Sequence, residues 1–186
     1  MSAHIDYEIN KELGECYLFM GEFDKAAEYY RKAAEAAPEN AEPQLGLATI
    51  AVQHGELEKA MDLYAKAAAL APSDKAYAGL ALVELEKGMH EEAFGHFAMA
   101  LGENPVNMFA INGLVQEGYF LQRLAEVVPH LENALGVSDN ESLRYTLAGC
   151  LTALGRDAEA KGQLETLLGM NPENESAQEL YARFAA

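Results

Sequence analysis

The sequence predicts an all-α protein built as a solenoid, in which helical hairpins of similar length stack on one another. Two observations predict it: a composition dominated by helix-forming residues, and a glycine–proline pair that recurs at a fixed spacing. Four glycines each stand seventeen residues before a proline, and successive pairs are offset by 34, 33 and 67 residues: Gly21 with Pro38, Gly55 with Pro72, Gly88 with Pro105 and Gly155 with Pro172. Such a period is typical of repeat proteins whose units cannot bury their apolar faces alone.

The residues around each glycine predict two helices in every period. A leucine followed by a small residue lies eight positions before the glycine, an alanine lies five positions after it, and a large apolar residue follows four positions later. Spacings of three and four place such residues on one face of a helix. The glycine can adopt the left-handed conformation that ends the first helix, and the proline ends the second. Each period is therefore expected to form a helical hairpin.

We expect five hairpins and a closing helix in a single domain without a linker. The expected hairpins span residues 7–40, 41–73, 74–107, 108–140 and 141–174, and the closing helix spans residues 175–185. The closing helix is expected to cover the exposed face of the last hairpin, as the terminal unit of a solenoid must.

The fourth hairpin departs from the pattern. Gln122 and Asp139 stand where the glycine and the proline are expected, and Pro129 falls inside the second helix. A proline in a helix interior removes a hydrogen bond and costs about 3 kcal/mol. We therefore expect this helix to start late, with Pro129 in its first turn, or to be kinked. Residues 119–128 would then be irregular or would extend the first helix.

Two stretches of the chain resemble the tetratricopeptide repeat (TPR) family. They read LGECYLFMGEFDKAAEYYRKAAEAAPEN and LATIAVQHGELEKAMDLYAKAAALAPSD, and they carry that family's leucine, small, glycine, alanine, aromatic, alanine and proline positions in order. The resemblance covers almost the whole chain. It implies a right-handed superhelical solenoid of about five TPR hairpins, whose first helices line a concave groove. It also implies a non-enzymatic protein–protein interaction module.

Placing the chain on the family pattern gives the expected partner-binding residues of the groove: Leu18, Phe19, Leu45, Thr49, Val52, Leu82, Leu85, Phe109, Asn112, Gln116, Tyr119, Phe120 and Tyr145. A surface that is apolar in its middle and aromatic toward the fourth repeat suits an amphipathic helix or an extended apolar peptide. The alternative is that the aromatic residues of the fourth repeat pack against the helix around Pro129, and that Leu82 and Leu85 belong to the core.

The charges at the groove narrow the partners that the resemblance implies. Five glutamates would favour basic residues beside the partner's apolar anchors: Glu8, Glu12, Glu15, Glu42 and Glu86. Some family members grip the C-terminal carboxylate of chaperones with lysine and asparagine. Lys11 and Lys75 are present here, but Glu15, Gly46 and Gly79 stand at the other positions. This departure argues against a receptor for chaperone tails.

Composition excludes other partners. With 13 basic and 30 acidic side chains the net charge is −17, which repels phosphate backbones and anionic lipid. We expect no nucleic-acid partner and no membrane insertion, since no stretch approaches ~18 apolar residues. The N-terminal residues show no signal peptide, and Cys16 and Cys150 are expected to be reduced thiols. We expect a cytoplasmic protein, or a periplasmic one if a leader has been removed.

Catalytic residues, metal sites and cofactors are all expected to be absent. His90 and His96 resemble a zinc motif, but their spacing of six residues points them to different sides of a helix. Two functions stay open. The first is an adaptor that binds a partner peptide or amphipathic helix in the groove. The second is a self-assembling homo-oligomeric scaffold, for example on a bacterial organelle or secretion assembly.

Overall fold

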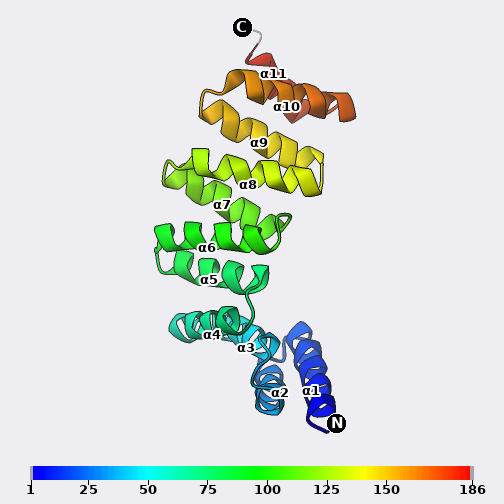
Figure 1. Ribbon diagram of the computed structural model, residues 1–186, viewed down its shortest axis with the longest axis vertical. Helices are drawn as coiled ribbons and strands as arrows, with labels where there is room; N and C mark the ends of the chain where they lie inside the picture. The colour runs from blue at the N-terminus through cyan, green and yellow to red at the C-terminus, as the bar shows by residue number, and fades with distance from the viewer. Residues whose placement is uncertain (1, 185–186) are drawn as a thin grey trace. The chain divides into compact units, whose positions relative to one another are not determined.

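The structure is a computed structural model, and it describes residues 2–184. In this range it contains eleven α-helices and no strand, which confirms the all-α prediction. The helices are α1 (Ser2–Phe19), α2 (Phe23–Ala36), α3 (Glu42–Gln53), α4 (Leu57–Leu70), α5 (Asp74–Glu86), α6 (His90–Glu103), α7 (Met108–Phe120), α8 (Leu124–Val137), α9 (Glu141–Ala153), α10 (Asp157–Met170) and α11 (Glu175–Ala182). The first ten form five hairpins and α11 follows alone (Figure 1).

The helices pack into two compact units. Unit 1 is Met1–Glu103 and holds the three hairpins from α1 to α6; unit 2 is Asn104–Ala186 and holds α7 to α11. Inside each unit, every helix contacts the next one along the chain, as Figure 1 also shows. Each unit therefore has its own stack of hairpins, and the single domain expected from the sequence stays a prediction.

Unit 1 buries small residues of one helix beneath tyrosines of a neighbouring helix. Tyr30 of α2 packs with Ala26, Ala27 and Ile50, and Tyr64 of α4 lies in a second core with five residues of α3, α4 and α5. The approach is so close that a Cβ atom on Gly46 would lie 2.3 Å from the Tyr30 ring. A glycine beneath the tyrosine ring therefore allows this close approach between the hairpins.

Helix α11 covers the last hairpin of unit 2. Ala177 of α11 is buried together with Leu164 and Leu167 of α10 and Ala148 of α9. Leu180 and other apolar residues of the C-terminal segment pack against this cluster. The expectation that the closing helix covers the last hairpin is thus met. Its helical part ends at Ala182, and the last expected residue, 185, lies outside the described range.

The hairpin turns share one backbone conformation. The four glycines that define the period have φ angles of 76°, 72°, 73° and 70°, in the left-handed region. Gln122 occupies the same place in the fourth hairpin and has a φ of 59°. Its turn also closes with the same pair of backbone hydrogen bonds, from Gln122 N to Tyr119 O and from Arg123 N to Gly118 O. The degenerate repeat therefore keeps the turn without the glycine that favours it.

The prediction that the helix around Pro129 starts late, with Pro129 in its first turn, is wrong, and so is the expectation that residues 119–128 are irregular or extend the first helix. The alternative, a kink at Pro129, stays a prediction. Helix α8 begins at Leu124 and passes through Pro129 in its second turn, and α7 ends at Phe120 as the first helix of a regular hairpin does. The proline is exposed, and so is Ala125, whose carbonyl loses its partner and can bond water instead. Burial of five apolar residues on the opposite face holds the helix: Leu124, Val127, Val128, Leu131 and Ala134.

Candidate protein-binding surface

All thirteen expected groove residues lie on the first helices of hairpins, and none of them is buried. Seven belong to α1, α3 and α5, which we call the first-helix face of unit 1. Six belong to α7 and α9, the first-helix face of unit 2. Because each side chain keeps solvent-exposed area, both faces present apolar surface that a partner could cover.

The first-helix face of unit 1 is a shallow apolar surface supported by the core beneath it. Leu18, Leu45 and Val52 are half-buried and pack against the hydrophobic clusters of their hairpins. Thr49 donates a hydrogen bond to the Leu45 carbonyl at 3.0 Å, and its Oγ1 lies 3.3 Å from the Tyr64 hydroxyl. One side of each of these residues therefore packs on the core, and the other side is exposed to solvent.

A lysine neutralises part of the acidic rim of unit 1, the name we give to the groove glutamates Glu8, Glu12, Glu15, Glu42 and Glu86. Lys11 Nζ lies 3.0 Å from Glu8 Oε2 and 3.8 Å from Glu42 Oε2. The hydrogen bond to Glu8 raises the pKa of Lys11. Tyr7 donates a hydrogen bond to Glu42, and burial together with that bond raises the pKa of Tyr7. The rim is therefore less acidic than the sequence suggests.

Gly46 and Gly79, which stand where carboxylate-gripping family members have asparagine or a basic residue, have a packing explanation. Gly46 lies beneath the Tyr30 ring and Gly79 beneath the Tyr64 ring, with 2.3 Å from a hypothetical Cβ to the nearest ring atom in both cases. Both tyrosines are buried, so neither ring can move aside cheaply. Asparagine or a basic residue cannot be accommodated at these positions in this packing. The departure from the carboxylate-gripping pattern thus follows from how the hairpins stack.

The first-helix face of unit 2 contains a hollow of about 440 Å³. Tyr119 of α7 and Tyr145 of α9 line it, and they are 49% and 39% exposed. Its other lining residues are Gly149, Thr152, Ala153, Leu180 and Arg183. Tyr119 also borders a second hollow of about 260 Å³. Two exposed aromatic side chains from successive first helices therefore share one concave surface.

Sequence reasoning missed the contribution of the closing helix to this hollow. Leu180 lies on α11 and Arg183 directly follows that helix, and the two residues, three positions apart, fall on one side of it. That spacing of an apolar and a basic residue was the available signal. Arg183 makes no ion pair with a described residue, and it lines the hollow together with the two tyrosines.

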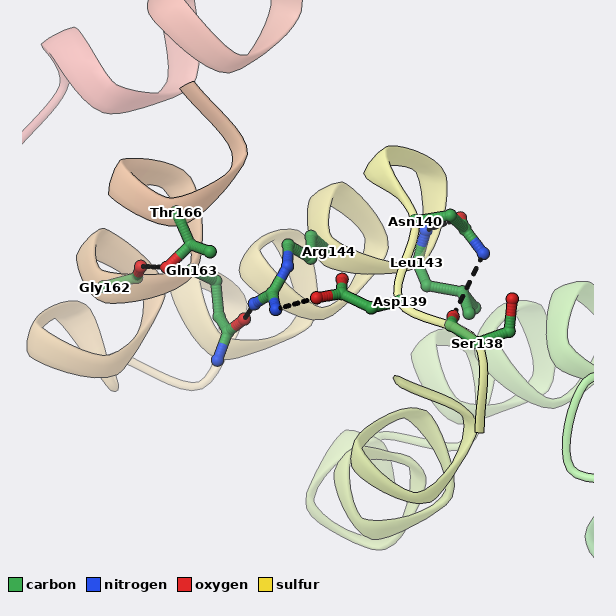
Figure 2. Close-up of polar contacts among 8 residues, drawn as sticks. All are labelled: Ser138, Asp139, Asn140, Leu143, Arg144, Gly162, Gln163 and Thr166. Carbon is green, nitrogen blue, oxygen red and sulfur yellow. Dashed lines mark hydrogen bonds and ion pairs between the residues drawn. The ribbon is translucent and has the colours of Figure 1, made fainter. Parts of the chain in front are cut away.

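A network of polar contacts fixes the start of α9, which carries Tyr145. Asn140 caps this helix by accepting a hydrogen bond from Leu143 N at 3.0 Å. Arg144 donates to Gln163 Oε1 of α10 at 2.7 Å and to Asp139 Oδ2 at 2.5 Å (Figure 2). These contacts tie α9 both to α10 and to the loop before it. Tyr145 follows Arg144 directly, so its backbone is held in place.

The two cysteines differ in their surroundings. Cys16 is exposed and Cys150 is buried, and both are free thiols. Burial raises the pKa of Cys150 to about 11, and its hydrogen bond with Tyr119 acts in the opposite direction. Cys150 is therefore a protonated thiol at neutral pH and a poor nucleophile.

The comparisons with known proteins agree with this architecture. A family model described as the tetratricopeptide repeat matches residues 19–82 and 121–184, which together are more than half of the chain. The chain belongs to the tetratricopeptide repeat family. This family is in general a non-catalytic protein-interaction fold, so the function class is protein–protein interaction. The sequence matches no curated protein.

Solved structures share the fold of this TPR protein at low sequence identity. PilF of Pseudomonas aeruginosa has a TM-score of 0.68 at 18% identity, covering 97% of this chain and 90% of that chain. The MamA protein has a TM-score of 0.65 at 19% identity, covering 97% and 96%. YrrB, a TPR protein with an unusual peptide-binding site, has a TM-score of 0.63 at 15% identity, covering 91% and 89%. These likenesses establish the TPR solenoid fold.

Other sites in the TPR protein lie away from the first-helix faces. His96 Nδ1 lies 2.7 Å from Glu84 Oε2, and its ring stacks on Tyr77, so this histidine joins α6 to α5. Two hollows of unit 1, of about 340 and 380 Å³, are lined by other residues, including Phe23 and His54. Among residues 2–184, no helix is both long enough and apolar enough to cross a membrane.

Proposed function

We propose that this TPR protein is an adaptor that binds an apolar segment of a partner protein on its first-helix faces. The hollow of unit 2 carries the proposal, because Tyr119 and Tyr145 present two exposed aromatic rings to one concave surface. Exposed aromatic side chains in a concave setting are the residues that contribute most to protein–protein affinity.

The mechanism is burial of an apolar anchor. A large apolar side chain of the partner enters the hollow between Tyr119 and Tyr145 and displaces water from both rings. Asn112 and Gln116 are exposed and lie one turn apart on α7, so their amide groups can pair with the partner's backbone. Leu180 also lines the hollow and supplies further apolar area. An amphipathic helix or an extended peptide can satisfy this arrangement.

The fold offers a precedent for such binding. YrrB shares the architecture of this chain and is a TPR protein with an unusual peptide-binding site. At 15% identity the likeness concerns the fold. It shows that a stack of hairpins of this kind can hold a peptide, which supports the proposal without assigning the residues that do so.

A peptide selection tests the proposal. A random peptide library is panned on the native chain, and selected peptides are titrated calorimetrically against native protein and the double variant Tyr119→Glu, Tyr145→Glu. Both side chains are exposed, so the variant should fold as the native chain does, which circular dichroism checks. Loss of two aromatic anchors, each worth about 2 kcal/mol, should weaken binding by more than about a hundredfold.

The variant Met170→Glu is the matched control. Met170 ends α10 and is as exposed as Tyr119, so Met170→Glu adds one negative charge, as each tyrosine substitution does, away from the first-helix face. Peptides should bind this control with unchanged affinity. If the double variant binds selected peptides as tightly as the native chain, the proposed surface is wrong.

Self-assembly is the competing outcome. Light scattering after size exclusion measures the mass of the native chain across concentrations, starting from its monomer mass of 20.2 kDa. The adaptor proposal expects a monomer at all concentrations. A mass that rises with concentration, and returns to that of a monomer in the double variant, would assign the same surface to a homo-oligomeric scaffold instead.

A further inference from the structure

The outward side of α1 is the surface from which we draw a further inference, independent of the proposed function. Ile5, Ile9, Glu12 and Cys16 lie on one side of this helix at helical spacing, and all four are exposed. We call these four residues the α1 end face. The Ile9 side chain is 52% exposed, which is unusual for an isoleucine in the middle of a helix that belongs to a packed hairpin.

The same side of the later first helices is covered. The positions equivalent to Ile9 are Pro43 in α3, Ala76 in α5 and Leu143 in α9, and all three are buried. The positions equivalent to Cys16 are Ile50, Val83 and Cys150, and they are buried as well. Every one of these helices contacts the second helix of the preceding hairpin: α2 for α3, α4 for α5 and α8 for α9.

Helix α1 has no such preceding helix among residues 2–184. It packs against α2 and α3, and its end face is left to solvent. The repeat geometry thus specifies the kind of element that fits there: a helix lying where the second helix of a preceding hairpin would lie. The area presented by two isoleucines and a thiol gives that helix an apolar surface to bury.

Glu12 determines which charge the covering helix must carry where it meets α1. Its equivalents in α3 and α5 are Gly46 and Gly79, on which the rings of Tyr30 and Tyr64 lie. A second helix of the repeat type would place its large apolar residue directly on the Glu12 carboxylate. Burying an unpaired carboxylate beneath an apolar ring is costly, and Glu12 makes no ion pair with a described residue. The covering helix therefore needs a lysine or arginine at that point.

A second copy of the chain fits this requirement poorly. In the last hairpin the residue equivalent to Tyr30 and Tyr64 is Leu164, and it is already buried beneath α11. The net charge of −17 also opposes the approach of another copy to an acidic helix. We propose that the α1 end face docks a basic amphipathic helix of another protein, with apolar residues on Ile5, Ile9 and Cys16 and a cationic residue on Glu12.

Cys16 provides a direct reporter for this face. It is exposed at the end face, whereas Cys150 is buried and should stay unreactive while the chain is folded. The probe is a synthetic amphipathic helix of leucine and lysine of about five turns, with a leucine–glutamate peptide of the same pattern as the comparison. The rate of alkylation by iodoacetamide at each cysteine is followed by mass spectrometry, with and without peptide.

We expect saturating leucine–lysine peptide to slow alkylation of Cys16 by about tenfold or more, and the leucine–glutamate peptide to leave it unchanged. Ile9→Asp should remove the protection by the leucine–lysine peptide, and Glu12→Lys should weaken it. Ile9 and Glu12 are exposed, so neither change should affect folding. The variant Met99→Cys places a reporter on α6 of the same unit, at a side chain that is also exposed, and its alkylation should not respond to peptide.

Three results would overturn the inference. The first is a Cys16 that stays fully reactive in the presence of the leucine–lysine peptide. The second is equal protection of Cys16 and of the thiol introduced by Met99→Cys, since the peptide would then coat the acidic protein without a site. The third is protection of Cys16 by raising the concentration of the native chain alone, because a second copy would then be the occupant.

Discussion

At the scale of single residues, the fourth hairpin shows how a conserved geometry can survive the loss of the residue that favours it. Gln122 adopts the left-handed conformation that glycine holds in the four other hairpin turns. The left-handed conformation costs a residue with a side chain roughly 1–2 kcal/mol, whereas glycine adopts it freely. The turn at Gln122 is therefore strained, and the packing of α7 on α8 sustains it.

The substitution Gln122→Gly should stabilise the protein by about 0.5–1 kcal/mol, because relief of strain exceeds the added entropy of glycine in the unfolded chain. The measurement is the midpoint of thermal unfolding followed by circular dichroism. Gly155→Gln is the matched reverse change in the next hairpin, where a Cβ would meet nothing within 4 Å. It should destabilise by a similar amount. A neutral or destabilising effect of Gln122→Gly would show that the turn is not strained.

At the scale of helices, the period of the sequence predicts the hairpins because each signal is local. The turn conformations, the small residues beneath the tyrosines and the closing helix all follow from residues within one or two hairpins. The start of α8 could not be predicted in the same way. The cost of a proline in a helix is a local quantity of about 3 kcal/mol, and burial of Leu124, Val127, Val128 and Leu131, each worth about 1.5–3 kcal/mol, exceeds it.

The closing helix allows a direct test of packing at this scale. Ala177 of α11 is fully buried against Leu164 and Leu167, whereas Ala182 at the end of the same helix is exposed. Ala177→Asp should lower the stability of unit 2 by about 2–4 kcal/mol, because it buries a carboxylate without a partner. Ala182→Asp should change it by less than about 0.5 kcal/mol. Chemical denaturation compares the two variants, and equal effects would show that α11 does not cover the last hairpin.

At the scale of the whole molecule, the chain combines an acidic surface with apolar first-helix faces. The thirteen residues that the sequence placed on these faces all retain exposed area, although whether they bind a partner stays a prediction. The spacing of Leu180 and Arg183 indicates that they share one side of the closing helix, but their place at the hollow depends on how that helix packs against the last hairpin, which the spacing does not give. The neutralisation of the rim by Lys11 also depends on a contact between two hairpins, from α1 to Glu42.

Binding of a partner to the first-helix face of unit 2 can be measured directly by nuclear magnetic resonance. Amide resonances of labelled protein are followed while a selected peptide is added. Chemical shifts are expected to change in α7 and α9, around Tyr119 and Tyr145, and at Leu180 and Arg183. Changes confined to the exposed sides of α8 and α10 would instead place the partner on the second helices and contradict binding at the first-helix face.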